Sequence, residues 1–496
     1  MVPTNSNIVV TKKDDVYLRI QAEPSIAQEL HSYFCFDVPD ARFHPLFRAK
    51  KWDGKLHLFS MFTKELYVGL LNYVKHFAEV NNYTLIDNSG TAANSSITIE
   101  IVKKFIDSLN LNLPNNESIR EYQVEAVYQC ILDKRRLLLS PTGSGKSLII
   151  YCLIRWYELN NNKQLIIVPT TSLVEQLFSD FQFYSQKNGW KATYNVHRIY
   201  TGQEKTTDLP ITISTWQSLH KFKKPYFTQF QVVYGDECHQ FKAKSLTGIM
   251  NKCVNAPYKV GTTGTLDGLK THRLVLEGLF GPVYKTTTTK KLIEAKQLSD
   301  LKIYAIVLKY PDDVCNANKK FKYQEEMDFL CGYSRRNTFI RNLALSQTRN
   351  TLVLFQFVEK HGKILYDLIS SSSRDRKVFF VHGGTETHQR EEIRKITEQE
   401  KNAIIIASYG TFSTGINIRN LYNIVFASPT KSRIRNLQSI GRGLRIGEED
   451  VRCNLYDIGD DMSWKTKKNY TLEHMVERIK IYADEQFDYT LAKVNL

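Results

Sequence analysis

Ser140-Pro141-Thr142-Gly143-Ser144-Gly145-Lys146-Ser147 follows the apolar run Leu137–Leu139 and precedes Leu148–Tyr151. This order predicts a strand, a tight glycine-rich loop and a helix, which together bind phosphate groups through backbone N–H donors and the positive end of the helix dipole. In such a loop Lys146 reaches the β- and γ-phosphates, and the Ser147 hydroxyl ligates Mg²⁺. Ser140 departs from the pattern G-x-x-x-x-G-K-[ST], so the stretch alone leaves an ordinary glycine-rich turn open as the alternative.

A pair of carboxylates follows a second predicted strand. Val232–Gly235 leads into Asp236-Glu237-Cys238-His239, and open α/β sheets gather their ligands at the carboxyl ends of their strands. Asp236 is expected to hold Mg²⁺ through water, and Glu237 to orient or deprotonate the water that attacks the γ-phosphate. Together with the glycine-rich loop, this pair favours an ATPase or GTPase over a solvated acidic turn.

Apolar strands alternate with amphipathic helices from Glu117 onward, the pattern of parallel sheets covered on both faces. We therefore expect an α/β protein with two such sheet domains in tandem behind a small N-terminal α+β domain, with boundaries at 1–112, 113–290 and 291–496. The predicted strands of the first sheet are 137–139, 165–168, 211–214, 232–235 and 258–261. Those of the second are 303–308, 351–355, 377–381, 403–407, 423–427 and 453–457. The N-terminal region has strand-like runs at 8–10, 16–20, 56–59, 66–71 and 96–102, and a helix-like stretch at 70–80.

Composition narrows the class of protein. The 496 residues are 42% apolar, which is enough for several cores, and they contain neither an apolar run of membrane-spanning length nor a signal-peptide pattern, so we expect a cytoplasmic protein. The eight cysteines are scattered without metal-site spacing and predict reduced thiols. The net charge is +16, divided as zero for 1–112, +9 for 113–290 and +7 for 291–496. This excess favours a polyanion such as nucleic acid as partner, with a generally basic solvated surface as the alternative.

One segment of the N-terminal region combines cations with aromatic rings. Within Arg42–Lys55, five cations alternate with three aromatic residues. Arg48, Lys50 and Lys51 suit phosphate contacts, and Trp52 suits base stacking. The alternative is that the aromatic residues belong to the core and that Trp-Asp-Gly forms a hairpin turn.

The order and spacing of the motifs resemble those of superfamily 2 helicases. The motifs are Ser140–Ser147, Asp236–His239, Gly261-Thr262-Thr263-Gly264-Thr265 and Gln438-Ser439-Ile440-Gly441-Arg442-Gly443-Leu444-Arg445. The chain also resembles the helicases of T-even phages over its whole length, including Arg42–Arg48, Trp52–Gly54, Tyr323–Glu326, Tyr482–Glu485 and Val494–Leu496. The resemblance implies two RecA-like domains, an N-terminal substrate-recognition domain, ATP and Mg²⁺ as cofactors and DNA as substrate.

The resemblance assigns further residues to the nucleotide. Gln123 can pair with the adenine N6 and N7, while Arg120 or Tyr122 covers the ring, although an ordinary helix start is the alternative. The residues implied at the phosphates and ribose are Thr142, Gly143, Ser144, Gly145, Lys146, Ser147 and Gly415. Arg442 and Arg445 are expected to act as arginine fingers on the γ-phosphate, with Gln438 meeting the nucleotide or His239.

Other motif residues are implied in gripping one nucleic-acid strand by its phosphates. They follow strands and open helices, so simple helix caps are the alternative. These residues are Pro169, Thr170, Thr171, Thr215 and Trp216. Thr263 and Thr265 resemble the family motif that couples hydrolysis to movement, and Ser408–Asn417 resembles the motif that contacts ribose and DNA, so Thr263 and Thr411 are also expected at the nucleic acid.

The function implied is ATP-driven unwinding or branch migration of forks, Holliday junctions, D-loops and R-loops with 3′-to-5′ polarity. The expected protein is a monomer in a host cytoplasm, with single-strand-binding or recombination proteins as further partners. Two alternatives stay open at this point: an RNA helicase, because a cleft that grips the backbone discriminates poorly between sugars, and a clamp that ATP switches without unwinding.

Overall fold

The structure is a computed structural model of the 496-residue chain. It describes all residues except 1–6, 40, 92, 93, 95, 115, 116, 201–203, 243, 267, 374, 412–417, 419, 429–431, 433–439 and 441–451, and the side chains of 242 and 387. The chain forms two compact units, residues 1–140 with 145–286 and residues 141–144 with 287–496.

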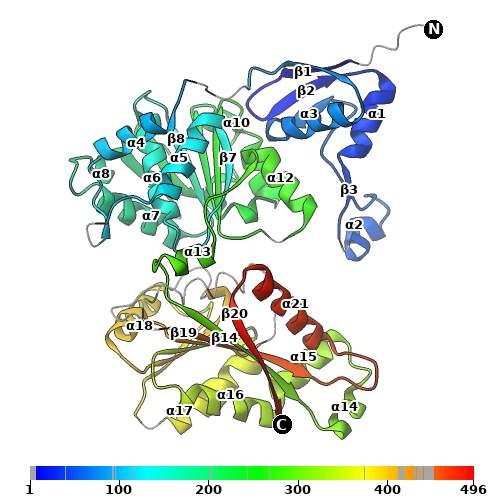
Figure 1. Ribbon diagram of the computed structural model, residues 1–496, viewed down its shortest axis with the longest axis vertical. Helices are drawn as coiled ribbons and strands as arrows, with labels where there is room; N and C mark the ends of the chain where they lie inside the picture. The colour runs from blue at the N-terminus through cyan, green and yellow to red at the C-terminus, as the bar shows by residue number, and fades with distance from the viewer. Residues whose placement is uncertain are drawn as a thin grey trace. The chain divides into compact units, whose positions relative to one another are not determined.

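The N-terminal region of the first unit is a small α+β layer structure (Figure 1). In the described residues its main sheet has four strands in the order β5-β2-β1-β6, with β1 and β6 parallel and β2 antiparallel to both neighbours. Alternate residues of β1 are buried, Ile8 and Val10 among them, because successive side chains point to opposite faces. The elements are β1 (Asn7–Lys12), β2 (Tyr17–Gln21), α1 (Pro24–Tyr33), β3 (Cys35–Asp37), α2 (Pro45–Arg48), β4 (Lys55–His57), β5 (Glu65–Tyr67), η2 (Val68–Leu70), α3 (Leu71–Val80) and β6 (Thr84–Asn88).

The rest of the first unit is built on a parallel sheet that has seven strands in the described part of the chain, in the order β13-β7-β12-β11-β8-β10-β9. Residues of one strand alternate between two cores. Ile166 and Val168 pack under one set of helices, whereas Leu165 and Ile167 pack under the other. The strands are β7 (Arg135–Leu139), β8 (Gln164–Val168), β9 (Val196–Ile199), β10 (Ile211–Thr215), β11 (Val232–Asp236), β12 (Tyr258–Thr263) and β13 (Val283–Lys285).

Helices cover both faces of this sheet, and Figure 1 shows the α5–α7 group and α12 on opposite sides of it. The first group is α4 (Ile99–Ser108), α5 (Glu121–Asp133), α6 (Lys146–Glu158), α7 (Thr171–Tyr184) and α8 (Ala192–Asn195). The second is α9 (Trp216–Leu219), α10 (Lys224–Phe227), η4 (Cys238–Lys242), α11 (Lys244–Met250) and α12 (Lys270–Phe280). The predicted strand at 96–102 is wrong. Val102, Ile106 and Leu109 are buried at helical spacing in the same core as α5, so the 3.6-residue period prevails there.

The N-terminal region packs closely on α12. A Cβ atom at Gly69 would lie 1.9 Å from the Glu277 carbonyl oxygen, so only glycine permits this approach. Tyr73 donates a 2.5 Å hydrogen bond to the Glu277 carboxylate across the same contact. The N-terminal region is therefore held on the first sheet domain as part of one unit.

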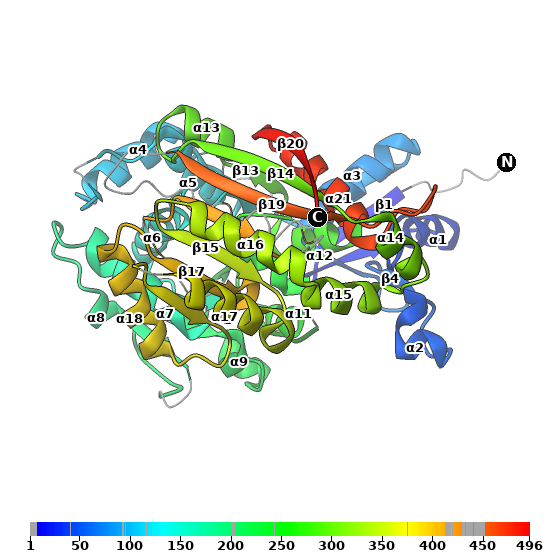
Figure 2. The same cartoon turned by 90° about the horizontal axis from the view of Figure 1, so that it is seen from below.

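The second unit contains another parallel sheet, which has seven strands among the described residues in the order β16-β17-β15-β18-β19-β14-β20. Both views show β14 and β19 side by side (Figures 1 and 2). The strands are β14 (Leu301–Lys309), β15 (Thr351–Phe355), β16 (Val378–Val381), β17 (Ile404–Ser408), β18 (Asn423–Phe426), β19 (Cys453–Asp461) and β20 (Asp488–Asn495). The helices are α13 (Thr289–Glu294), α14 (Asp312–Asn318), α15 (Tyr323–Gly332), α16 (Ser334–Ser346), α17 (Lys363–Ser372), α18 (Thr387–Gln399) and α21 (Tyr470–Asp484).

Two fully buried ion pairs attach helices to β19. Arg336 of α16 lies 2.7 Å from the Asp460 carboxylate, and Arg478 of α21 lies 2.8 Å from that of Asp457. The sheet arrangement confirms the predicted fold class of two parallel α/β sheet domains with a small N-terminal α+β region. Across the described residues, no helix has both the length and the apolar character needed to span a bilayer.

Candidate active site

The loop 140–147, called the P-loop below, connects β7 to α6. The Ser140 N–H donates a 2.8 Å hydrogen bond to the Thr263 carbonyl at the end of β12, which fixes the start of the loop. Gly143 and Gly145 have φ angles of +84° and +80°, the left-handed conformation that favours glycine, and α6 begins directly after Gly145. Lys146 Nζ donates to the Ser140 carbonyl at 3.2 Å. The predicted strand, loop and helix are thus present.

Gln123 lies against this loop. A Cβ atom at Gly145 would stand 2.3 Å from the Gln123 Nε2 atom, and the Gln123 side chain is 3% exposed. Its Oε1 atom accepts a 3.0 Å hydrogen bond from the Arg120 backbone N–H, and Arg120 Nη1 donates to the Tyr122 hydroxyl at 3.2 Å. The structure therefore brings the three residues predicted at the adenine to the helix start beside the P-loop.

Asp236 is the last residue of β11 and is buried. It accepts hydrogen bonds from the Thr262 hydroxyl at 2.7 Å and from the Glu237 backbone N–H at 2.9 Å. Burial and the neighbouring Glu237 carboxylate raise the pKa of Asp236, whereas the Lys146 ammonium acts in the opposite direction. Two carboxylates and the P-loop lysine thus share one electrostatic environment, which favours an added cation.

Glu237 has a φ angle of +48°, an uncommon conformation for a side chain of this size and one that often marks functional sites. His239 Nδ1 lies 3.3 Å from the Glu237 carboxylate and 3.1 Å from the Thr263 hydroxyl. That hydroxyl donates to the Thr265 carbonyl at 2.9 Å, so it can accept a hydrogen bond from a protonated His239 Nδ1. A polar chain therefore runs from Glu237 through His239 to the 263–265 loop.

Sequence reasoning missed several contacts of the predicted residues. The Ser147 hydroxyl lies 2.9 Å from the hydroxyl of Tyr184, whose pKa is raised by burial. Thr286 lies 2.9 Å from the Ser140 hydroxyl, and Thr262 bonds to Asp236. Of these three residues, only Thr262 lies within a recognised motif.

The two loops predicted to grip a strand adjoin one another at the carboxyl edge of the first sheet. Val168 of β8 pairs with Thr215 of β10, and the Gln217 side-chain amide donates to the Pro169 carbonyl at 3.2 Å. Thr170 caps α7, and the Thr215 hydroxyl lies 3.0 Å from that of Ser218, so both loops also serve their helix starts.

Four of the predicted nucleic-acid residues are buried: Pro169, Thr215, Thr263 and Thr411. Thr263 is fully buried and bonded as described above, so its side chain presents no surface to a nucleic acid. Thr411, after β17, is 5% exposed, and its hydroxyl lies 2.8 Å from that of Ser408. Gly415, Gln438, Arg442 and Arg445 lie outside the described residues, and their roles stay predictions.

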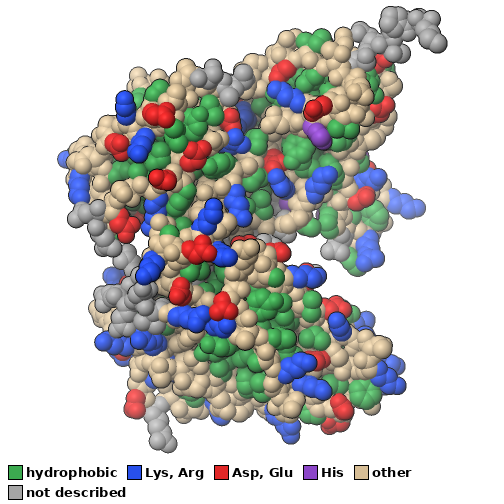
Figure 3. Space-filling model, in the orientation of Figure 1, with side chains coloured by type: hydrophobic (Ala, Val, Ile, Leu, Met, Phe, Trp, Pro, Cys, Tyr) green, Lys and Arg blue, Asp and Glu red, His purple; other side chains and the backbone are tan. Residues whose placement is uncertain are grey.

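The basic aromatic segment around α2 stands outside the N-terminal core. Phe43 is 57% exposed and Phe47 is 37% exposed, which argues against the alternative that these rings are core residues. Trp52 is half-buried, and its indole N–H donates to the Lys55 carbonyl at 2.8 Å. Exposed cations surround a shallow hollow here, and Figure 3 shows Lys and Arg side chains over the α2 region. The residues lining this hollow are Arg42, Phe47, Arg48, Lys50, Lys51, Trp52 and Asp53.

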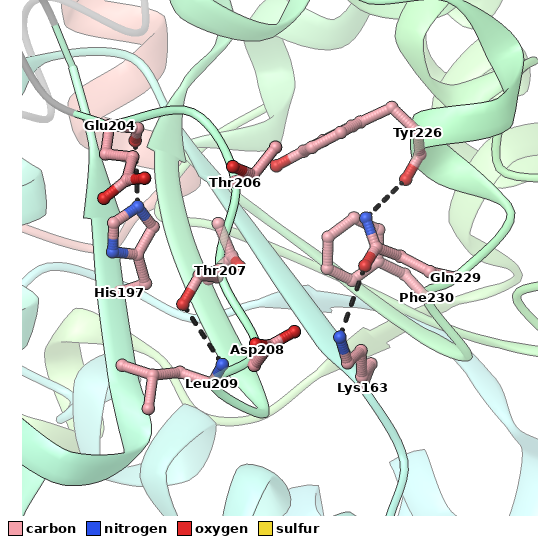
Figure 4. Close-up of a pocket in the computed structure, with 11 residues that line it drawn as sticks. Lys163, His197, Glu204, Thr206, Thr207, Asp208, Leu209, Tyr226, Gln229 and Phe230 are labelled. Atoms are coloured by element: carbon pink, nitrogen blue, oxygen red, sulfur yellow. Dashed lines mark hydrogen bonds between the residues drawn. The ribbon is translucent and has the colours of Figure 1, made fainter.

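A separate pocket of about 540 Å³ lies at the amino ends of β8 and β10 (Figure 4). Lys163 Nζ donates to the Gln229 side chain at 3.4 Å, and His197 Nε2 lies 2.9 Å from the Glu204 carbonyl. Because the strands are parallel, this pocket is on the opposite edge of the sheet from the P-loop.

Comparisons with known proteins agree with this geometry. Residues 7–87 match the family described as DNA helicase UvsW, N-terminal; residues 116–268 match the res subunit of type III restriction enzymes; and residues 334–447 match the helicase conserved C-terminal domain.

Individual relatives extend the match. The chain is 35% identical to the ATP-dependent DNA helicase uvsW of Enterobacteria phage T4, over 99% of this chain and all of that one. It is 24% identical to the DNA 3′-5′ translocase XPB2 of Sulfurisphaera tokodaii, over 71% of this chain and 84% of that one. The crystal structure of T4 UvsW aligns over 99% of both chains with a TM-score of 0.52 and 34% identity.

Proposed function

Because this chain belongs to the UvsW family of superfamily 2 DNA helicases, we propose that it uses ATP hydrolysis to unwind or branch-migrate forks, Holliday junctions, D-loops and R-loops. The name of the archaeal relative, a 3′-5′ translocase, supports a 3′-to-5′ polarity. Such substrates would place the protein in DNA recombination, repair and replication, acting as a monomer.

One observation carries the proposal. The register of the first sheet places Ser140, Pro169, Thr215, Asp236 and Thr263 at the ends of neighbouring parallel strands. The loops that we assign to the nucleotide and the loops that we assign to the nucleic-acid strand therefore lie at the same edge of one sheet. Because they are neighbours, a change at the nucleotide is transmitted to a bound strand over a short path. We assign Lys146 to the β- and γ-phosphates, Glu237 to the attacking water, and Arg120, Tyr122 and Gln123 to the adenine.

The residues present suit Mg²⁺ held mainly by nucleotide phosphates and water. Magnesium typically takes only one or two carboxylates from the protein in phosphate-transfer sites. No group of three or more His, Cys, Asp or Glu able to hold a metal occurs among the described residues, while the buried Asp236 favours an added cation. Ser147 and Asp236 would hold the ion, which would neutralise charge that develops on the phosphates.

The polar chain from Glu237 through His239 to Thr263 supplies a physical route for coupling. Because Thr263 is buried, we assign it to coupling within the protein. A change in the charge or position of Glu237 during hydrolysis alters the hydrogen bond of His239, which in turn bonds the Thr263 hydroxyl. The 263–265 loop is thereby linked to the state of the nucleotide.

The α2 segment is assigned to the branch of the substrate. The region 1–112 has no net charge, so it is a poor general polyanion binder. Its α2 segment nevertheless places three exposed cations, Arg48, Lys50 and Lys51, beside the half-buried Trp52. Cations beside an aromatic ring suit a duplex arm with an exposed terminal base pair. The motor loops would hold the tracking strand while this site orients the arm.

The test compares ATPase stimulation and unwinding on a fork, a four-way junction, an R-loop and duplex RNA. The proposal expects DNA-stimulated ATPase and strand displacement on branched DNA. Greater activity on duplex RNA would favour the RNA helicase alternative, and strong ATPase without displacement would favour the clamp.

A variant with Arg48, Lys50 and Lys51 replaced by alanine isolates the role of the α2 segment. It is expected to retain ATPase stimulation by single strands and to lose junction processing. A control variant removes the same charge elsewhere in residues 1–112, by replacing Lys12, Lys64 and Lys103 with alanine. This control is expected to process junctions at the wild-type rate. Equal junction rates for both variants and the wild type would refute the branch assignment.

A further inference from the structure

Six exposed lysines gather on the second unit in two segments that are far apart in the sequence. We call this set the lysine patch: Lys319, Lys320, Lys322, Lys465, Lys467 and Lys468. The first three lie between α14 and α15, and the others lie in the loop between β19 and α21. Figures 1 and 2 both show that loop beside α14. Figure 3 shows Lys and Arg side chains around the end of the unit that carries α14.

Hydrogen bonds hold the two segments together. Lys467 Nζ donates to the Lys319 carbonyl at 2.9 Å, which joins one segment directly to the other. Within the second loop, the Trp464 and Lys467 backbones exchange hydrogen bonds of 3.0 and 3.1 Å, closing a tight turn in which Lys465 has a φ angle of +54°. The patch is therefore a built surface whose shape does not depend on a ligand.

Glu326 anchors the base of this loop. Its carboxylate is 2% exposed and accepts hydrogen bonds from the Asn469 side chain at 2.9 Å and from the Tyr470 and Thr471 backbones at 3.0 and 2.7 Å. The Thr471 hydroxyl adds another at 2.7 Å. The stretch Tyr323–Glu326, one of those through which the sequence resembles phage helicases, thus has a structural role in presenting the lysines.

The charge of the patch is not neutralised by the protein. Among the described residues, none of the six lysines forms an ion pair with Asp or Glu, and the Lys319 ammonium donates to the neutral Asn316 side chain. Carboxylates also lie close by, among them the exposed Asp312 and Asp313 of α14. Glu326 is buried and bonded, Glu325 accepts from the Lys322 backbone, and Glu473 lines the adjoining pocket. The surface is therefore prepared for an external polyanion.

Aromatic rings lie between the lysines. A pocket of about 350 Å³ is lined by Phe321, Trp464 and Tyr470 together with Lys319, Lys467 and Lys468. Tyr470 is 41% exposed, and its ring packs edge-on against that of Tyr323 with the centroids 6.0 Å apart. Lysines interleaved with partly exposed aromatic rings are typical of surfaces that bind nucleic-acid backbones without reading sequence.

The patch lies at the carboxyl edge of the second sheet, the edge that also carries Thr411. All strands of this sheet are parallel, and β17 is separated from β19 by β15 and β18. At about 4.8 Å per strand spacing, β17 and β19 are about 14 Å apart across the sheet, and β19 continues to Asp461, beyond the level at which β17 ends. A nucleic-acid strand of a few nucleotides spans that distance.

We propose that the lysine patch binds the phosphate backbone of the DNA on which the motor acts, as a contact surface in addition to the helicase motifs. This inference rests on the proposed function, because it takes the helicase substrate as the ligand. The patch holds lysines without arginine, so it would act as a set of point charges that bind without sequence preference and with strong salt dependence.

The test uses the full chain with Lys320, Lys465 and Lys468 changed together to alanine, since none of these three side chains forms a hydrogen bond to another described residue. DNA binding is measured without nucleotide at 50 to 200 mM salt, on single-stranded and duplex DNA. Each lost phosphate contact lowers the slope of log K against log salt by about 0.9 for duplex and about 0.7 for single strands. The variant is expected to bind DNA more weakly. On the DNA form that the patch contacts, single-stranded or duplex, the magnitude of its salt slope should fall by about 2 to 3.

A matched variant, Lys377, Lys395 and Lys401→Ala, removes the same charge elsewhere on the same unit and is expected to keep the wild-type slope. Basal ATPase without DNA should be unchanged in both variants, which also reports on folding. The patch proposal is overturned if the first variant keeps the wild-type slope on both DNA forms, or if both variants lose slope equally. If the patch variant keeps the wild-type salt slope while the wild type binds DNA and hydrolyses ATP, the patch proposal fails and the proposed function still holds.

Discussion

The Gln123 side-chain amide lies so close to Gly145 that a Cβ atom there would stand 2.3 Å from Gln123 Nε2. The residue predicted at the adenine thus supports the loop predicted at the phosphates. Gly145→Ala would both strain the backbone at φ +80° and push Gln123 away. We expect ATP binding, measured with a fluorescent analogue, to weaken by tenfold or more, which corresponds to about 1.4 kcal/mol.

Gly189→Ala is the matched control, because Gly189 has a φ angle of +75° and no atom within 4 Å of the added carbon. It carries similar backbone strain without the contact. ATP affinity near the wild-type value in Gly145→Ala, or an equal loss in both variants, would mean that the contact with Gln123 does not shape the nucleotide site.

Glu237→Gln should bind ATP normally and hydrolyse it very slowly. The amide keeps the size of the carboxylate but cannot accept a proton from water, while Lys146, Ser147 and Asp236 remain in place to bind the nucleotide. Lys146→Ala should lose hydrolysis through loss of the phosphate contact. Nucleotide affinity and single-turnover rates separate the two effects, and an equal loss of affinity in both variants would assign Glu237 a structural role.

Lys259 gives a prediction about pH. It is 1% exposed and donates to the Asp15 carbonyl at 2.8 Å, and burial followed by the nearby Arg135 lowers the pKa of Lys259 to about 7. The unfolded chain keeps this proton up to about pH 10.4. Between about pH 7 and 10 the unfolded state therefore binds more protons, so this residue makes stability rise with pH by up to about 1.4 kcal/mol per pH unit.

Lys259→Met should remove that rise. Urea unfolding at pH 7.5 and pH 9 gives the free energy of unfolding of the wild type and of the variant. The free energy of unfolding of the wild type minus that of the variant should be larger at pH 9 than at pH 7.5. Lys244→Met, at an exposed lysine, should follow the wild-type dependence. Parallel pH profiles for wild type and Lys259→Met would show that Lys259 keeps an ordinary pKa in the folded protein.

Arg442→Ala and Arg445→Ala test the arginine-finger prediction, which rests on the sequence. A finger acts on charge that develops in the transition state, so each change should lower kcat much more than it raises KM, by roughly 10³ if the residue acts on the γ-phosphate. Steady-state ATPase with saturating DNA makes the comparison. A kcat within a few-fold of wild type would exclude that residue as a finger.

The predicted strands of both sheets were found because buried parallel strands read as short apolar runs between helices. The strands that sequence reasoning missed lack this signal. β13 has three residues, β9 contains His197 and Arg198, and the residues of β20 are almost all exposed at the sheet edge. The segment 96–102 has isoleucine at alternate positions 97, 99 and 101, as a strand would, whereas the buried positions of α4 follow a helical period.

The motif residues of the site could be predicted because phosphate chemistry demands particular residues at fixed local spacing. Their partners could not, because tertiary structure creates those contacts. Tyr184 reaches Ser147 from the far end of α7, and Glu326 reaches Thr471 across 145 positions of the sequence. No local pattern marks either residue as part of a site.

Unwinding of a forked DNA by wild type and Lys146→Ala, with ATP and Mg²⁺, tests the central claim most directly. The account predicts that the wild type displaces the strand and that the variant binds the fork but displaces nothing. Strand displacement by Lys146→Ala at the wild-type rate, or none by a wild type that hydrolyses ATP, would contradict the claim that this P-loop drives a DNA helicase.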